Sequence, residues 1–228
     1  MHNTVVIIKK QLRDTVRNKT ILIQFILFPL MTVIMENAVN IEGMQEHFFT
    51  RLFAVMYIGM APLMATTAVI SEEKEKNTLR VLLMADITPV QYLAGIGVYV
   101  WTICMLGAAV MSATLRAGER PVFLLFMGAG FILSILAGAC IGILSKNQMT
   151  ATSVSLPIMM VLAFAPMLSM FNKTIEKFSA VAYTQQIKLL IDRMSLADVS
   201  GTGTLILIGN ALACILLFLL AYRKKGLE

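Results

Sequence analysis

Residues 52–89 read LFAVMYIGMAPLMATTAVI followed by SEEKEKNTLRVLLMADITP. The first part, 52–70, carries no charged residue and is about as long as the 20 residues of helix that cross a bilayer. The second part begins with mixed acids and lysines and ends in a leucine-rich run before Pro89. The stretch therefore predicts a membrane-spanning helix that continues into water and is followed by a short amphipathic helix.

The composition of the whole chain also indicates a lipid environment. Of its 228 residues, 58% are hydrophobic and 14% are charged, and the mean hydropathy is +0.80. Soluble domains average about 45–50% apolar and about 25% charged residues, so a soluble domain is excluded. Basic cytoplasmic loops account for the net charge of +6, and we therefore expect no nucleic-acid partner.

Further apolar runs predict the other membrane crossings. We expect an all-α membrane protein with a single transmembrane domain over 1–228. Its six spans are expected at 21–41, 52–70, 92–115, 122–144, 149–171 and 199–222. The first run is the shortest, because Glu36 and Asn37 interrupt it. The alternative, the apolar core of a signal peptide, is less favoured because the charged leader before it is long.

The positions of the lysines and arginines predict the orientation. Six crossings place both termini on one side, and a cytoplasmic location of the termini puts most of these residues inside. Tyr222 followed by three basic residues is typical of an anchor at the inner interface. We expect a multi-pass protein of a bacterial plasma membrane with both termini cytoplasmic.

Two segments outside the spans have amphipathic helical patterns. In 4–19 the apolar residues form one stripe with basic residues beside it, which favours a helix in the plane of the inner interface over a simple charged leader. In 172–198, Ile187, Ile191 and Met194 repeat at helical spacing. We expect this outer segment to form an amphipathic hairpin that either re-enters the membrane or packs on the outer ends of the spans.

A ridge of small residues lies in the fourth predicted span. Ser134, Gly138 and Gly142 recur every four residues, so they share one face of the helix. Such a face favours close packing of another helix. The alternative, that the smooth face borders a substrate path, stays open.

The sequence shows no catalytic constellation. It lacks a phosphate-binding loop, a zinc-protease motif and a nucleophile elbow, and its histidines, His2 and His47, are far apart. The cysteines at 104, 140 and 214 lie singly in apolar runs, which gives neither a disulfide framework nor a metal site. We expect no catalytic site, metal or cofactor in this chain. A proton- or sodium-driven carrier is also disfavoured, since no acid lies at mid-membrane.

The loop at 71–89 resembles the signature of permeases of ATP-binding-cassette exporters of the type 2 membrane family. In that family an acidic E-x-E-K/R stretch, a small turn, T-L and a leucine-rich helix precede a T-P or S-P step. The usual glycine before the threonine is Asn77 here, which tolerates a positive backbone angle. The resemblance extends over the whole chain, although the outer segment lacks the common proline before Tyr183.

The resemblance implies that two permease chains, here expected to form a homodimer, work with two ATPase subunits that bind ATP and Mg. It implies a cytoplasmic gate and coupling loop over 72–88. The coupling helix would contact the ATPase through Leu79, Arg80, Leu82, Leu83 and Met84. The end of the gate helix would contact it through Glu72, Glu73, Lys74 and Glu75.

The mechanism implied is alternating access, with substrate moving along the dimer interface between the second and fifth spans. Candidate lining residues are Met56, Met60, Met64, Met159, Met160, Phe164 and Met167. Flexible methionines suit varied apolar cargo, although core filling is their commoner use. No long outer loop is present between spans, which favours export of a hydrophobic or amphipathic molecule. A peptide or toxin is the first candidate, and a drug or lipid the second.

Two other classes of function stay open. The chain could be a membrane scaffold or sensor that docks a cytoplasmic partner through residues 79–84 without transport. It could also be a channel-like oligomer. Neither would require a nucleotide-dependent change of shape.

Overall fold

The computed structural model describes residues 19–39, 43, 45–84, 87–195 and 201–225, and this part of the chain contains helices and no strand. The helices are α2 (Lys19–Ala38), α3 (Phe48–Glu75), α4 (Thr78–Met84), α5 (Pro89–Ser112), α6 (Arg120–Leu144), α7 (Gln148–Leu168), α8 (Lys173–Ser179), α9 (Tyr183–Arg193) and α10 (Gly201–Lys225). The all-α prediction is confirmed for these residues. The predicted in-plane helix at 4–19 lies outside them except at Lys19, where α2 begins.

Among the described residues, five helices are long and apolar enough to cross a membrane, namely α3, α5, α6, α7 and α10. They correspond to the second to sixth predicted spans, with shifted ends. The first predicted crossing also forms a helix, but its apolar part, Leu22–Ala38, is shorter than these five and shorter than the roughly 20 residues that cross a bilayer. Helices α8 and α9 occupy the predicted hairpin region.

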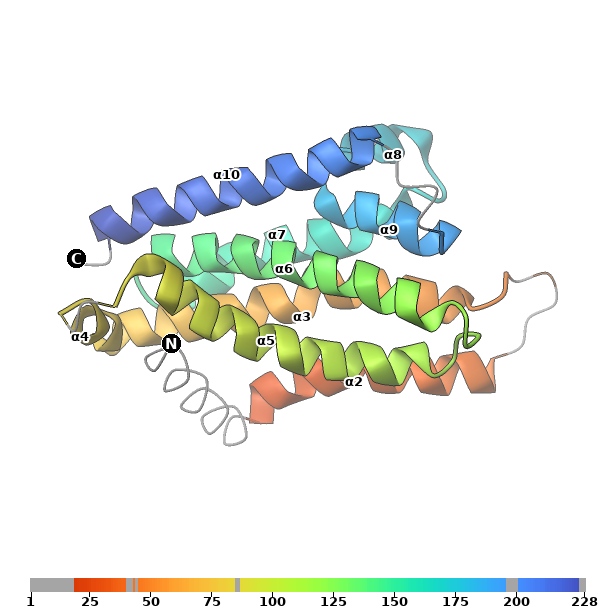
Figure 1. Ribbon diagram of the computed structural model, residues 1–228, viewed down its shortest axis with the longest axis horizontal. Helices are drawn as coiled ribbons and strands as arrows, with labels where there is room; N and C mark the ends of the chain where they lie inside the picture. Colours follow the sequence, from red (N-terminus) through yellow and green to blue (C-terminus); the bar gives the residue numbers. More distant parts are fainter. Residues whose placement is uncertain (1–18, 40–42, 44, 85–86, 196–200, 226–228) are drawn as a thin grey trace.

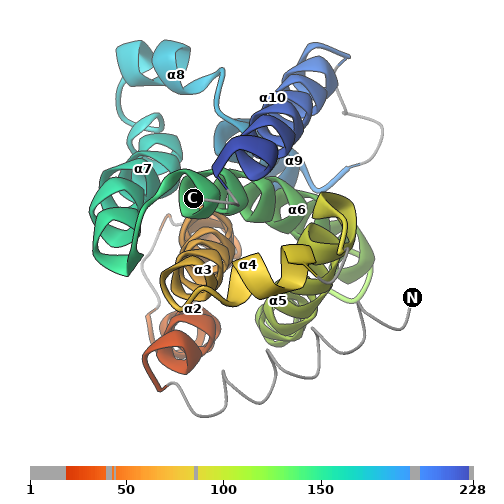
Figure 2. The same ribbon diagram turned by 90° about the vertical axis from the view of Figure 1, so that its left-hand side faces the viewer.

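The long helices run side by side along one axis, and α4 lies at the opposite end of the bundle from α8 and α9 (Figure 1). Seen from the α4 end, α3 is enclosed by α2, α5, α6 and α7, while α10 lies on the far side of α6 from α3 (Figure 2). Helix α3 is therefore the central element of the bundle, and α2, α5, α6 and α7 all pack on it (Figure 2).

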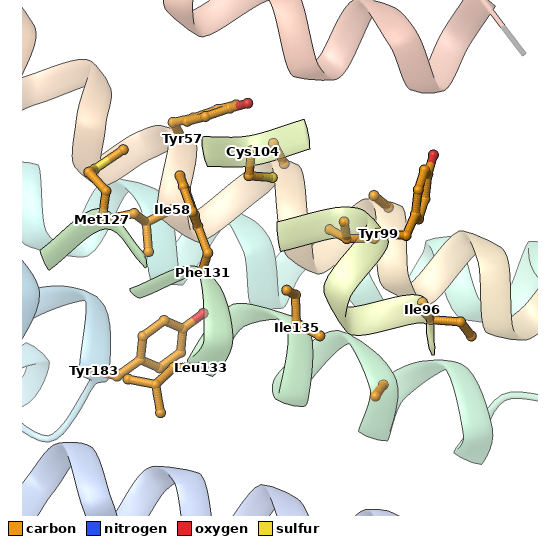
Figure 3. Close-up of a cluster of buried hydrophobic side chains, with 14 of the residues drawn as sticks. Tyr57, Ile58, Ile96, Tyr99, Cys104, Met127, Phe131, Leu133, Ile135 and Tyr183 are labelled. Atoms are coloured by element: carbon orange, nitrogen blue, oxygen red, sulfur yellow. The ribbon is translucent and has the colours of Figure 1, made fainter. Parts of the chain in front are cut away.

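The core is built around aromatic side chains of the central helices (Figure 3). Tyr57 on α3 meets the ring of Phe131 on α6 edge-on at 5.5 Å between centroids. Its hydroxyl donates a hydrogen bond of 3.2 Å to the carbonyl of Phe25 on α2. Both rings are fully buried, which ties three helices together at mid-bundle.

The small-residue ridge of α6 packs directly against α3. The hydroxyl of Ser134 donates a 2.6 Å hydrogen bond to the carbonyl of Ile58. A Cβ added at Gly138 would lie 2.4 Å from the carbonyl oxygen of Leu63, closer than any side chain allows. The ridge is therefore a helix-packing surface in this fold, and it does not border an open path.

Candidate functional site

The end of α3 and the start of α4 are joined by a sharp turn at Asn77. The amide of Lys76 donates to the carbonyl of Glu72 at 3.0 Å, and Asn77 then takes a φ of 57° in the left-handed region. This confirms the predicted positive backbone angle at Asn77, which ends α3. The carbonyl of Asn77 accepts from the amide of Val81 at 3.3 Å, so Asn77 precedes the first turn of α4, which begins at Thr78.

Helix α4 divides its described side chains between the core and the solvent. Leu79 is 1% exposed and belongs to the main hydrophobic core, whereas Val81 is 63% and Met84 is 71% exposed. Leu79, which the resemblance assigns to the ATPase contact, is covered by its own chain and so anchors α4. The side chains of Arg80, Leu82 and Leu83 lie outside the described part of the structure.

A capping box fixes the start of α5 just after α4. The Thr88 hydroxyl accepts from the backbone amide of Gln91 at 3.3 Å, and the Gln91 side chain accepts from the Thr88 amide at 3.2 Å. Pro89 takes the first helical turn, where a missing amide hydrogen is harmless. The TPVQ sequence at 88–91 carries this signal, so α5 begins earlier than the predicted 92.

A buried carboxylate connects the end of α3 to α5. Glu73 is 5% exposed, and its Oε2 accepts a 2.6 Å hydrogen bond from the hydroxyl of Tyr92, which is fully buried. The ring of Tyr92 lies 5.9 Å from that of Tyr222 on α10. The Tyr222 hydroxyl in turn donates to the carbonyl of Ile87 at 3.4 Å, so α10 and the α4–α5 connection meet at the same point.

Two further charges on α3 contact the ends of neighbouring helices. The ammonium of Lys74 donates to the carbonyl of Ile143 at 3.1 Å, at the carboxyl end of α6. The carboxylate of Glu75 accepts from the amide of Gln148 at 2.9 Å, at the amino end of α7. Each charge has the sign that the helix dipole favours at that end. Glu72 pairs with Lys76 along α3 itself.

All four predicted gate-helix residues therefore have partners within this chain, and three of them contact other helices. Through Glu73, Lys74 and Glu75 the end of α3 is connected to α5, α6 and α7. Helix α4 follows α3 after a turn and buries Leu79 in the same core, so α4 is connected through α3 to all of these helices. The arrangement is suited to transmitting movement, which the sequence pattern alone did not indicate.

The predicted cleft residues lie along the contact between α3 and α7. The two helices approach closely, since a Cβ added at Gly59 would lie 2.9 Å from the backbone nitrogen of Ala163. Met159 is 8% exposed and packs with Leu63, and Met60 and Met64 lie against this cluster. Of the other four positions, Met160 is exposed, whereas Met56, Phe164 and Met167 are half-buried, as Met60 and Met64 are. Of these, Met160 is 54% exposed, so the set divides between core filling and an outward face of α7.

A polar cluster at the opposite end of the bundle was missed by the sequence interpretation. Glu36 on α2 accepts hydrogen bonds from the amide and hydroxyl of Thr50 on α3, at 3.0 and 3.1 Å. The Thr50 hydroxyl also bonds that of Thr114 after α5, at 2.8 Å. A pocket lined by Glu36, Glu46, His47, Thr114, Leu115 and Arg116 adjoins it. These residues are distant in sequence and form no local motif.

Comparison with known protein families gives one result. A family model described as "ABC-2 family transporter protein" matches residues 2–222, which is nearly the whole chain. No curated protein matches the chain.

Proposed function

The chain belongs to the ABC-2 family of transporter proteins, and on this premise we propose that it is the membrane-spanning permease subunit of an ATP-driven exporter. It is a multi-pass membrane protein, and in the proposal ATP hydrolysis belongs to a separate subunit. In the proposed complex, two copies of the chain pair with two ATPase subunits, which bind ATP and Mg. Proteins of this family generally work with such a subunit.

The observation that carries the proposal is the position of α4. Val81 and Met84 present apolar surface to the solvent at 63% and 71% exposure, at the end of the bundle where the spans stop. Exposed apolar side chains outside the membrane gain stability when a partner covers them. A groove of a soluble subunit that receives a short helix is a common solution. In the proposal this end of the molecule is cytoplasmic, as the positive-inside rule favours.

The connections of α3 give the proposal its mechanism. When ATP closes the two ATPase subunits, the α4 helices approach each other. Glu73 accepts a hydrogen bond from Tyr92 on α5, and Lys74 donates one to the end of α6, so α5 and α6 then move together with α3. The inner ends of the spans close while the outer ends part, which is alternating access between two packings of rigid helices.

The proposed substrate is a hydrophobic or amphipathic molecule, with a peptide or toxin as the first candidate and a drug or lipid as the second. Its path would follow the α3–α7 side of the bundle, where the second copy of the chain is expected. The exposed side chains of α7 support this choice, since Met160 is 54% and Val161 is 63% exposed. A flexible apolar surface accepts cargo of varied shape.

The experiment that tests the proposal is co-purification of the tagged chain from its native membrane in mild detergent, followed by mass spectrometry. The test variant is Val81→Asp with Met84→Asp. The matched control is Phe178→Asp with Val181→Asp, which changes two side chains of 81% and 69% exposure at the other end of the bundle.

We expect the unchanged chain and the control to recover an ATP-binding subunit in equal amounts with the permease. The test variant should lose that subunit while its helix content stays the same. Recovery of the permease without any ATP-binding protein in all three preparations would overturn the proposal. That result would favour the scaffold or channel.

A further inference from the structure

An apolar groove lies between α5, α6 and α10, away from the α3–α7 contact. It has a volume of about 430 Å³, and its described lining contains only apolar residues and glycine. Six of them mark its walls: Leu93, Gly97, Trp101, Ile135, Ile215 and Phe218. Figure 2 shows α5 and α10 on opposite sides of α6, which forms the floor.

The groove is suited to a hydrocarbon chain rather than to water. No lining side chain leaves a polar group for water to bond, since the indole nitrogen of Trp101 already donates to the carbonyl of Gly128 at 3.1 Å. Val90 in the lining is 66% exposed, and Leu216, next to the lining residue Ile215, is 60% exposed, so the rim of the groove is apolar as well. The groove therefore opens sideways to lipid.

The length of the groove matches one leaflet. Along α5 it extends from Pro89 to Trp101. At 1.5 Å per residue this is about 18 Å. Half of the hydrocarbon core of a bilayer is about 15 Å. A chain of lipid length thus fits along the groove, with its polar end at the Pro89 end.

The Pro89 end of the groove lies at the end of α10 whose sequence is basic. Leu219 lines the groove, and α10 continues to Lys225. Arg223, Lys224 and Lys225 therefore follow Leu219 by about one to two helical turns. The carboxyl end of α10 and the start of α5 lie at the same end of the bundle (Figure 1). Three basic residues at this level favour an anionic headgroup over a neutral one.

We propose that this groove binds an acyl chain of an anionic phospholipid, whose headgroup lies at the basic end of α10. The inference rests on the proposed function only for the orientation, which places the bound lipid in the inner leaflet. The groove and the basic residues are features of the chain itself. Helix α6 separates the groove from the α3–α7 contact, so the bound lipid supports the outer wall of the bundle and is distinct from the cargo.

The single tryptophan of the chain provides the assay, because Trp101 lines the groove. The purified chain is reconstituted in phosphatidylcholine vesicles that contain a small fraction of a lipid brominated on its acyl chains. The brominated lipid is phosphatidylglycerol in one set and phosphatidylcholine in the other. Bromine quenches tryptophan fluorescence on contact. We expect at least twofold stronger quenching by the anionic lipid at equal fraction, without any ATPase subunit.

Two glycine variants form a matched pair. A Cβ added at Gly97 would lie 3.6 Å from the nearest atom, on Ile135, which is ordinary contact. Because Gly97 lines the groove, the rest of the side chain in Gly97→Leu is expected to occupy the groove. A Cβ added at Gly209 on α10 meets nothing within 4 Å. Gly97→Leu should abolish the extra quenching by phosphatidylglycerol, and Gly209→Leu should leave it unchanged. Replacing Arg223, Lys224 and Lys225 by Gln should make the two lipids quench equally.

The proposal is overturned if both lipids quench the unchanged chain equally, or if Gly97→Leu behaves like Gly209→Leu. Retention of the preference after loss of the three basic residues would overturn the headgroup assignment. Each of these results is independent of whether an ATPase partner exists, so failure of this inference is distinguishable from failure of the proposed function.

Discussion

The hydroxyl of Tyr92 donates a 2.6 Å hydrogen bond to Oε2 of Glu73, and both side chains are buried where α3, α5 and α10 meet. This contact joins the helix that leads into α4 to the helix that follows it. A buried carboxylate requires such a partner, since desolvation of an unpaired charge is costly. The pair therefore links the two helices that flank α4, α3 and α5, inside the bundle.

Replacing Tyr92 by Phe removes the hydroxyl that donates a hydrogen bond to the buried Glu73 carboxylate. The free energy of unfolding should fall by about 1.5–3 kcal/mol, the range for hydrogen bonds to charged groups. Denaturant unfolding in detergent measures it. Tyr222→Phe is the control, because the hydroxyl of Tyr222 lies 3.4 Å from its acceptor, a weaker geometry. Equal losses in both variants would contradict the special role of Tyr92.

The turn at Asn77 should respond to backbone preference alone. Its φ of 57° is strained for β-branched side chains and free of strain for glycine. Asn77→Gly should therefore keep the stability and the ATPase association of the unchanged chain. Asn77→Val should lose about 1–2 kcal/mol of unfolding free energy. A valine variant as stable as the glycine variant would show that the turn does not need the left-handed conformation.

The close approach of α6 to α3 makes Gly138 intolerant of any side chain. In Gly138→Ala the new Cβ would lie 2.4 Å from the carbonyl oxygen of Leu63. The helices must separate, which should destabilise the fold by about 1–3 kcal/mol or more. Gly209→Ala is the control, because its Cβ meets nothing within 4 Å and alanine is the better helix former. Thermal unfolding of the two variants side by side tests this, and a similar melting temperature for both would contradict the packing role.

The proposed orientation predicts which end of the bundle a membrane-impermeant reagent can label from each side of the membrane. Asn77 and Gly118 are exposed at opposite ends. Of the native cysteines, Cys104 and Cys140 are buried and Cys214 is half-buried within α10, so the unchanged chain measures the background labelling. A membrane-impermeant thiol reagent added to intact cells should label Gly118→Cys and not Asn77→Cys. Inverted vesicles should give the reverse. Labelling of Asn77→Cys in intact cells would place α4 outside and exclude contact with a cytoplasmic ATPase.

Much of this fold could be predicted because membrane helices have few alternatives. Long uncharged runs must form helices, so the spans at 52–70 and 122–144 were predicted with the right type and near-right bounds. The turn at Asn77 and the close packing at Gly138 also follow from local residue chemistry. The start of α5 was set too late, because the capping box at Thr88 was overlooked.

The partners of particular side chains could not be predicted. An apolar stripe on α4 shows that something covers Leu79, but not whether its own chain or another protein does so. The contacts of Lys74 and Glu75 depend on where the ends of α6 and α7 arrive, which local sequence does not encode. Contacts between Thr50 and Thr114, 64 positions apart, likewise require the packed structure.

The most direct test of the central claim, that α4 docks on an ATPase subunit, is photo-cross-linking in native membranes. A benzophenone amino acid replaces Met84 in one variant and Phe178 in the other, two side chains exposed at opposite ends of the bundle. We predict that light links position 84, and not position 178, to an ATP-binding subunit identified by mass spectrometry. A linked partner without a nucleotide-binding sequence at position 84, or no partner there at all, would contradict the account.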